Sequence, residues 1–178
     1  NPRQTEILYG KAIEFAGLTG CETVLDAYCG TGTIGLIAAR SAGHVIGVEL
    51  NGDAVADAME NARINEIKNA EFHKGDAGEF MTKAALAGNS IDVVIMDPPR
   101  SGASIEFLRS IVSLAPARIV YVSCNPETQA RDVNYLSYRG YRVKKIQPVD
   151  MFPHTDHVES VVLIVRAKRT DNVKREEK

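Results

Sequence analysis

The chain has 178 residues, of which 44% are hydrophobic and 25% charged, as is typical of one soluble globular domain with a full core. No run of about 18 apolar residues occurs, and no basic segment precedes an apolar one at the start, so neither a transmembrane helix nor a secretory signal is predicted. A formal net charge of −2 excludes a strongly basic nucleic-acid-binding domain and argues mildly against nucleic acid as a partner.

Three cysteines, Cys21, Cys29 and Cys124, occur in the chain, and none of them lies in a Cys-x-x-Cys motif. Three thiols cannot all pair, and their spacing argues against a disulfide framework or a zinc site. Such a pattern is typical of the reducing cytoplasm, where we expect the protein to be located.

Strand-like and helix-like stretches alternate along most of the chain. In chain order, we expect a helix at 2–16, a strand at 23–28, a glycine turn and helix at 29–42, a strand at 44–49, a helix at 53–65, a strand at 71–73, a helix at 77–86, a strand at 91–96, a helix at 104–114, a strand at 119–123, a helix at 127–138 and strands at 141–148 and 157–165. This order predicts an α/β fold with a mostly parallel sheet and an antiparallel edge hairpin. We expect one domain at 1–167 and a flexible polar tail at 168–178.

The first strand leads into a glycine-rich turn, Gly30-Thr-Gly32-Thr-Ile-Gly35, which opens a helix. Glycines let the backbone turn tightly and approach a ligand, and the helix N-terminus offers free N–H groups. The pattern alone is weakly specific, but Glu49 follows at the end of the second strand. A carboxylate there can accept hydrogen bonds from both hydroxyls of a ribose, so we expect a nucleoside cofactor rather than a merely solvated charge.

Two kinds of nucleoside cofactor fit this turn, a dinucleotide and S-adenosylmethionine, and the nearby acidic residues discriminate between them. A dinucleotide would place its pyrophosphate on the helix N-terminus. Asp26, just before the glycines, favours instead a cation such as S-adenosylmethionine, with its sulfonium and ammonium groups. Asp76, after the third strand, lies where an acceptor for an adenine amino group is expected, and it fits the N-cap of the next helix equally well.

Two further strand ends carry side chains suited to chemistry. The strand at 91–96 ends in Asp97-Pro-Pro-Arg100, where two prolines force a rigid turn that could hold a planar base. The strand at 119–123 leads to Cys124, so the thiol is expected at the carboxyl edge of the sheet, where open α/β sheets bind ligands. From position alone, a buried cysteine that packs as a small hydrophobe is an equal alternative.

Four stretches together resemble a known family: Asp-Ala-Tyr-Cys-Gly-Thr-Gly at 26–32, Asp-Pro-Pro-Arg at 97–100, Ser-Cys-Asn-Pro at 123–126 and Asp-Met-Phe-Pro-His-Thr-Asp-His-Val-Glu-Ser at 150–160. They resemble the RNA uracil-5-methyltransferases, which make 5-methyluridine in tRNA and in large-subunit ribosomal RNA. The resemblance covers essentially the whole chain and is to the C-terminal catalytic domain of those enzymes. It implies a class I S-adenosylmethionine-dependent methyltransferase fold (Rossmann-like), S-adenosylmethionine as cofactor and RNA as partner.

The resemblance also implies roles for single residues. C5 of uracil is too poor a nucleophile to take a methyl group unaided, so a thiolate first adds to C6 and a base later removes the C5 proton. Cys124 is implied as the nucleophile, Glu159 as the base, and Asp97 as a residue that holds the ring. The residues expected to contact the cofactor are Asp26, Tyr28, Gly30, Gly32, Glu49, Asp76 and Asp97.

Ribosomal RNA is the expected partner rather than tRNA, because the stretch at 150–155 is most similar to the ribosomal members. Arg131 is the basic side chain that we expect to contact the site. His154, Asp156 and His157 are expected to order the loop before Glu159 and not to bind a metal, which the reaction does not need.

Three other functions stay open at this point. An amino-group methyltransferase acting on adenine or guanine fits the Asp-Pro-Pro turn, but it has no use for Cys124, and Arg100 stands where an aromatic side chain would stack. A non-catalytic nucleic-acid-binding domain that kept the fold is the second, and the presence of Cys124 and Glu159 argues against it. A nicotinamide-dependent dehydrogenase is the third.

Overall fold

The computed structural model describes residues 2–151, 155 and 158–167. Its elements, in chain order, are α1 (Pro2–Ala16), β1 (Thr23–Ala27), α2 (Thr33–Ala39), β2 (His44–Glu49), α3 (Gly52–Ile64), β3 (Ala70–Lys74), α4 (Ala77–Leu86), β4 (Val93–Met96), α5 (Ile105–Leu114), β5 (Arg118–Ser123), α6 (Pro126–Ser137), β6 (Tyr141–Val149) and β7 (Glu159–Arg166). The predicted alternation of strands and helices is confirmed.

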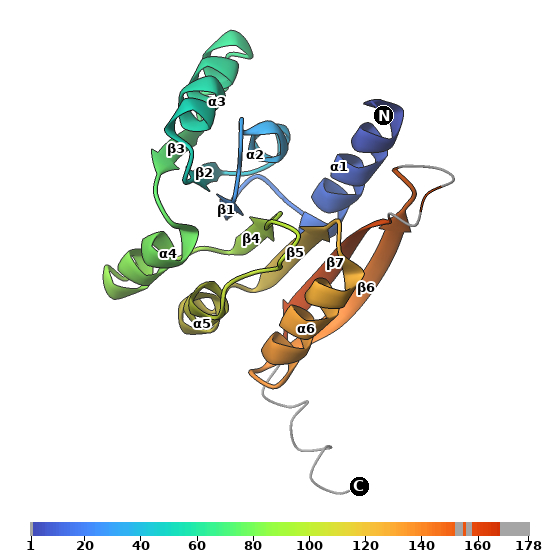
Figure 1. Ribbon diagram of the computed structural model, residues 1–178. Helices are drawn as coiled ribbons and strands as arrows, with labels where there is room; N and C mark the ends of the chain where they lie inside the picture. Colours follow the sequence, from blue (N-terminus) through green and yellow to red (C-terminus); the bar gives the residue numbers. More distant parts are fainter. Residues whose placement is uncertain (1, 152–154, 156–157, 168–178) are drawn as a thin grey trace, which may run out of the picture.

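The described strands form one seven-stranded sheet in the order β3-β2-β1-β4-β5-β7-β6 (Figure 1). Strands β1 to β5 are parallel, while β7 runs antiparallel between β5 and β6. This confirms the α/β fold with a mostly parallel sheet and an antiparallel pair at one edge. Because the strand order reverses beside β1, the carboxyl ends of β1 and β4 flank a topological switch point, where such sheets bind ligands.

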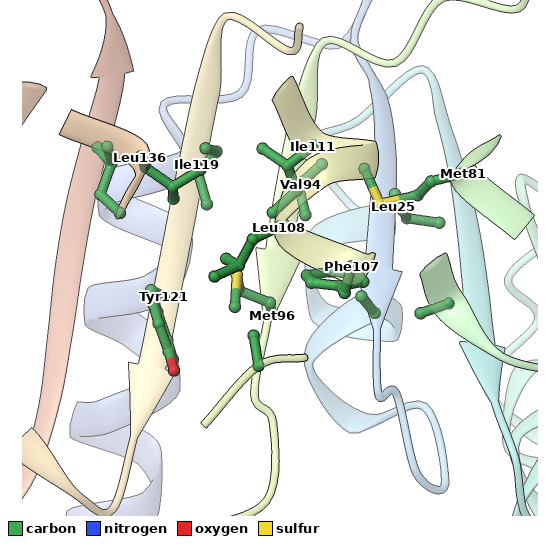
Figure 2. Packing of buried hydrophobic residues seen from close by; sticks show 14 of the residues in the cluster. Leu25, Met81, Val94, Met96, Phe107, Leu108, Ile111, Ile119, Tyr121 and Leu136 are labelled. Atoms are coloured by element: carbon green, nitrogen blue, oxygen red, sulfur yellow. The ribbon is translucent and has the colours of Figure 1, made fainter. Parts of the chain in front are cut away.

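Helices cover both faces of the sheet (Figure 1). On one face, α1 and α2 pack over a cluster that includes Val24, Ile95, Val122 and Val161. On the other face, α4, α5 and α6 pack over a second cluster, and Figure 2 shows Phe107, Leu108 and Ile111 of α5 in that layer. Within the described residues, no helix is long and apolar enough to cross a membrane.

Several element boundaries differ from the sequence prediction by a few residues, and two of these differences have clear local reasons. Strand β1 ends at Ala27, because Tyr28 has a left-handed backbone with φ of 62° and begins the glycine turn. Helix α6 begins at Pro126, because Asn125 caps it by accepting a hydrogen bond from the Glu127 N–H. Residue 157, where the last strand was predicted to begin, and the predicted tail at 168–178 lie outside the described residues.

Candidate active site

The glycine turn between β1 and α2 is a tight backbone cradle. Gly30 and Gly32 have φ of 53° and 83°, values that L side chains rarely adopt. The Gly32 N–H donates to the Cys29 carbonyl over 2.9 Å, which closes the turn at the start of α2. A Cβ at Gly32 would lie 2.9 Å from the Phe72 ring, so this position excludes any side chain. The predicted cofactor turn therefore has the shape that close approach of a ligand requires.

Glu49, the last residue of β2, lies over this turn. One of its carboxylate oxygens accepts the Gly30 N–H over 3.1 Å, and the other accepts the Asn51 N–H over 2.9 Å. Each oxygen has a second lone pair, so the carboxylate can still accept the two hydroxyls of a ribose. Glu49 is thus tied to the turn rather than being a free solvated charge.

Asp26 lies within β1, beneath the same turn, and is only 2% exposed. Its carboxylate accepts the Gly35 N–H over 2.8 Å, and a Cβ at Gly35 would lie 2.7 Å from that oxygen. Burial raises the pKa of Asp26 to about 7, against the lowering effect of the Gly35 N–H and with a further rise from the charges of Asp97 and Glu49. A cation bound here would favour the ionised form.

Asp76 and Tyr28 lie on the other side of the turn. Asp76 caps α4 by accepting the Glu79 N–H over 2.9 Å, so the N-cap alternative considered for it is confirmed. Burial raises the pKa of Tyr28 to about 12, and the charge of Asp76 adds to the rise, which indicates that the two side chains are neighbours. The Tyr28 ring packs against Phe107 with ring centroids 5.2 Å apart. An adenine acceptor role for Asp76 is compatible with its cap and stays a prediction.

Strand register brings Cys124 and Glu159 together. In the antiparallel pair of β5 and β7, Ser123 lies opposite Ser160. Cys124 directly follows Ser123 at the end of β5, and Glu159 directly precedes Ser160 at the start of β7, so the two residues flank this last pair on the same side of it. These two residues are separated by the whole of α6 and β6 in the sequence, so only the position of β7 beside β5 makes them neighbours.

Strand alternation and strand order bring the candidate acids and the thiol to one edge of the sheet. Side chains two positions apart along a strand share a face, and Val24, Ile95, Val122 and Val161 all pack in the cluster under α1 and α2. By this alternation Asp26 of β1 and Glu159 of β7 face the same side, and Asp97 and Cys124 directly follow the ends of the neighbouring strands β4 and β5. The predicted cofactor acids and the predicted catalytic residues therefore form one site.

Electrostatic coupling supports this grouping. Burial raises the pKa of Asp97 to about 7, and the charge of Glu159 raises it further. Burial also raises the pKa of Glu159 itself. Tyr9 of α1 was not predicted from the sequence. Its pKa is raised by burial and then by the charges of Asp97, Asp26 and Glu159, so its phenol lies among these acids. These acids form a cluster of negative charge that suits a cationic ligand.

Arg131 has partners within the protein. Its guanidinium bonds to Asp132, to the Ser101 carbonyl over 3.1 Å and to the Ala103 carbonyl over 3.3 Å, while its side chain is 58% exposed, so the predicted contact with the site stays a prediction. Cys29 is 9% exposed, and burial raises the pKa of its thiol to about 12, so it stays protonated and packs as a hydrophobe.

The predicted loop histidines, His154 and His157, and Asp156 lie outside the described residues. Among the residues that the structure describes, no group of three or more His, Cys, Asp or Glu side chains is arranged to hold a metal ion.

Comparison with known proteins identifies similar chains. Residues 9–167 match the family model described as tRNA (Uracil-5-)-methyltransferase. An uncharacterized RNA methyltransferase of Caldanaerobacter subterraneus is 55% identical over 166 residues, which are 93% of this chain and 37% of that protein. Another from Halalkalibacterium halodurans is 51% identical over 164 residues, 92% of this chain and 36% of that protein. The chain thus spans little more than a third of the length of these relatives.

A solved structure is similar in both sequence and fold. The Pyrococcus abyssi tRNA (uracil-54, C5)-methyltransferase, in complex with S-adenosyl-L-homocysteine, superimposes with a TM-score of 0.74 and 38% sequence identity. The match covers 89% of this chain and 37% of that one. The sheet described above is accordingly that of the class I methyltransferases.

Proposed function

Because the chain belongs to the tRNA (uracil-5-)-methyltransferase family, we propose that it transfers a methyl group from S-adenosylmethionine to C5 of a uridine in RNA, through a covalent bond between Cys124 and C6 of the base. The observation that carries this proposal is the pairing of Ser123 with Ser160, which brings Cys124 and Glu159 to the same edge of the sheet as Asp26 and Asp97. A thiol, a base and a cation-binding pocket are the three parts that this chemistry needs.

The residues of the site fit S-adenosylmethionine, which supplies an electrophilic methyl group on a positively charged sulfur. The turn at Gly30 and Gly32 admits close approach, and Glu49 presents two acceptors for ribose hydroxyls. Asp26 and Asp97 provide negative charge for the sulfonium and ammonium groups. A nicotinamide dinucleotide fits less well, because its pyrophosphate would meet these buried acids.

The chain's own residues perform the steps at the base. The Cys124 thiolate adds to C6 of uracil, which turns C5 into a carbon nucleophile. After C5 has gained its methyl group, the Glu159 carboxylate takes the C5 proton, and the C6–S bond breaks to release the Cys124 thiolate. Asp97 contacts the polar edge of the ring. A carboxylate whose pKa is raised by burial, as that of Glu159 is, is better matched to proton removal near neutral pH.

Two observations bear on which RNA is methylated, and they favour different molecules. The stretch at 150–155 is most similar to ribosomal members, and it motivates the proposal of ribosomal RNA. The Pyrococcus abyssi neighbour is named for tRNA. The protein, at the full length that its gene encodes, is incubated with labelled S-adenosylmethionine and with each RNA separately, and nucleosides are identified by mass spectrometry. Appearance of 5-methyluridine supports the proposal; N-methylated adenosine or guanosine would establish the amino-group alternative instead.

Binding of S-adenosylmethionine is expected to weaken as pH falls through about 7. Burial raises the pKa of both Asp26 and Asp97 to about 7, so below that pH both side chains are mostly protonated. A cationic ligand then binds the charged carboxylates only if these protons are released. Affinity should fall by up to about tenfold per pH unit for each proton released. S-adenosylhomocysteine has an uncharged sulfur and should show a shallower dependence. Calorimetry between pH 5.5 and 8.5 measures both ligands, with these pH limits chosen to bracket about 7.

The same two acids contribute to the pH dependence of the free protein's stability. An acid whose pKa is raised in the folded state adds stability below its ordinary pKa of about 4, and that stability is lost as pH rises through about 7. Asp97→Asn should therefore flatten both the ligand and the stability profiles, whereas Asp57→Asn, an exposed carboxylate on α3, should leave them unchanged. Identical profiles for S-adenosylmethionine and S-adenosylhomocysteine would contradict the assigned role of these acids.

A further inference from the structure

A buried carboxylate on α6 takes no part in the chemistry proposed above. Asp132 is 0% exposed. One of its oxygens accepts the Ala103 N–H over 2.8 Å and the Tyr121 hydroxyl over 2.8 Å, and the other accepts the Arg131 Nε–H over 2.8 Å. Burying a charge is costly unless it is paired and hydrogen-bonded, and these three hydrogen bonds supply the required partners for the Asp132 carboxylate.

Arg131 extends the same network toward the segment 97–103, the connection between β4 and α5. Its Nη2 lies 2.7 Å from Asp132, and it donates to the carbonyls of Ser101 and Ala103. Between these two carbonyls, Gly102 has φ of 81°, and a Cβ there would lie 2.6 Å from Arg131 Nη2. The segment therefore lies directly against the ion pair, with no room for a side chain.

The N-terminus of α6 holds the other half of this segment. The Asn125 side-chain amide donates to the Arg100 carbonyl over 3.1 Å, and the Thr128 hydroxyl donates to the same oxygen over 3.2 Å. All of these donors lie within the first turns of the helix that begins directly after Cys124. Tyr121, three residues before the thiol in β5, reaches Asp132 from below, and Figure 2 shows its hydroxyl directed toward the carboxyl end of the strand.

The network thus joins two strand ends that carry proposed catalytic residues. Asp97 begins the segment 97–103, and Cys124 lies between β5 and α6. We propose that Arg131 and Asp132 are positioning residues that hold the segment 97–103 against α6, and so set the separation between Asp97 and the Cys124 thiol for addition to the uracil ring. This inference rests on the proposed function, because that function supplies the step for which the separation matters.

Two variants test it in the protein at full length. Arg131→Gln removes the charge and the forked donor, and Asp132→Asn keeps the side-chain volume while removing the charge. Both should lower kcat for RNA methylation by about 10- to 100-fold while KM for RNA and the affinity for S-adenosylhomocysteine stay within about twofold, since small misplacement of reacting groups affects turnover rather than binding. Arg131→Lys, which keeps the charge, should recover part of kcat.

The matched control is Arg63→Gln. Arg63 forms a two-point pair with Glu60, with both N···O distances 2.7 Å, on the outer surface of α3. Its loss should leave kcat and KM unchanged. If Asp132→Asn fails to fold, Arg131→Gln and Arg131→Lys decide, because the Arg131 side chain is 58% exposed and its replacement leaves no buried cavity. Unchanged kcat in folded Arg131→Gln would overturn the proposal. A loss in kcat/KM that comes only from a higher KM, with kcat unchanged, would overturn it as well.

Hydrogen exchange separates this inference from the proposed function. In both variants the backbone amides of Gly102 and Ala103 should exchange at least about tenfold faster, while those of β1 and β4 keep their protection. Unchanged exchange at Gly102 and Ala103 would show that the pair does not hold the segment. Absence of methylation by the wild type would instead overturn the proposed function, and with it the catalytic consequence drawn here, whatever the exchange result.

Discussion

Replacing Cys124 with alanine is expected to abolish methylation of RNA, with a loss of at least about 10³-fold in kcat. Without addition of the thiolate at C6, C5 of uracil has no developed negative charge and cannot attack an electrophilic methyl group. The affinity for S-adenosylhomocysteine should be retained, because Cys124 follows β5, whereas the cofactor turn lies between β1 and α2. A selective loss of turnover would mark the residue as catalytic.

The decisive measurement uses RNA in which uridine is replaced by 5-fluorouridine. Fluorine cannot leave C5 as a proton does, so the covalent adduct should accumulate and be detected by mass spectrometry as a protein–RNA species that requires S-adenosylmethionine. Cys124→Ala should form none, whereas Cys21→Ala, which removes an exposed thiol away from the site, should form it normally. Methyl transfer that persists in Cys124→Ala would rule out the thiol mechanism and favour an amino-group methyltransferase.

Glu159→Gln has the second-largest expected effect, and its character differs. The variant should still form the covalent bond between Cys124 and ordinary uridine, because addition needs only the thiolate. It should fail to remove the C5 proton, so turnover should fall by about 10²- to 10³-fold while the methylated adduct accumulates. The same protein would thus be nearly inactive in turnover and strongly labelled in a gel that retains covalent complexes.

Glu127→Gln provides the comparison for this variant. Glu127 is an exposed carboxylate in the first turn of α6 and is close to Cys124 in the sequence. It takes no part in the pairing of β5 with β7, which brings Glu159 to the same edge of the sheet as Cys124. It should turn over like the wild type and accumulate no adduct. Normal turnover in Glu159→Gln, or failure to form any adduct, would remove Glu159 from the role of base.

Local patterns in the sequence were sufficient for the elements and for the kind of site. Runs of apolar residues and the positions of glycines can be read within a short segment of the chain. The strand before Cys124, the apolar strand after Glu159 and the glycine turn at Gly30 and Gly32 were therefore predictable. The resemblance of the motifs then implied the reaction, and the family match agrees with it.

Contacts between distant segments were decided only in three dimensions. The hairpin of β6 and β7 was predicted from the sequence. The sequence did not predict that β7 lies between β5 and β6, or that Ser123 pairs with Ser160, because both depend on where the apolar strand β7 packs in the sheet. Arg131 shows the same limit, because its hydrogen bonds to the segment after β4 were not predictable from its sequence neighbourhood.

The amino-acid sequence by itself determined the order of helices and strands, the acidic cofactor turn and the presence of a thiol at a strand end, because each is a local property of the chain. The tertiary structure alone decided that Asp26, Asp97, Cys124 and Glu159 lie at the same edge of the sheet, since the order and pairing of the strands bring together residues that are distant in the sequence. It also decided that the pKa values of Asp26, Asp97 and Glu159 rise, because burial of acids near one another depends on the packed fold and not on the order of residues.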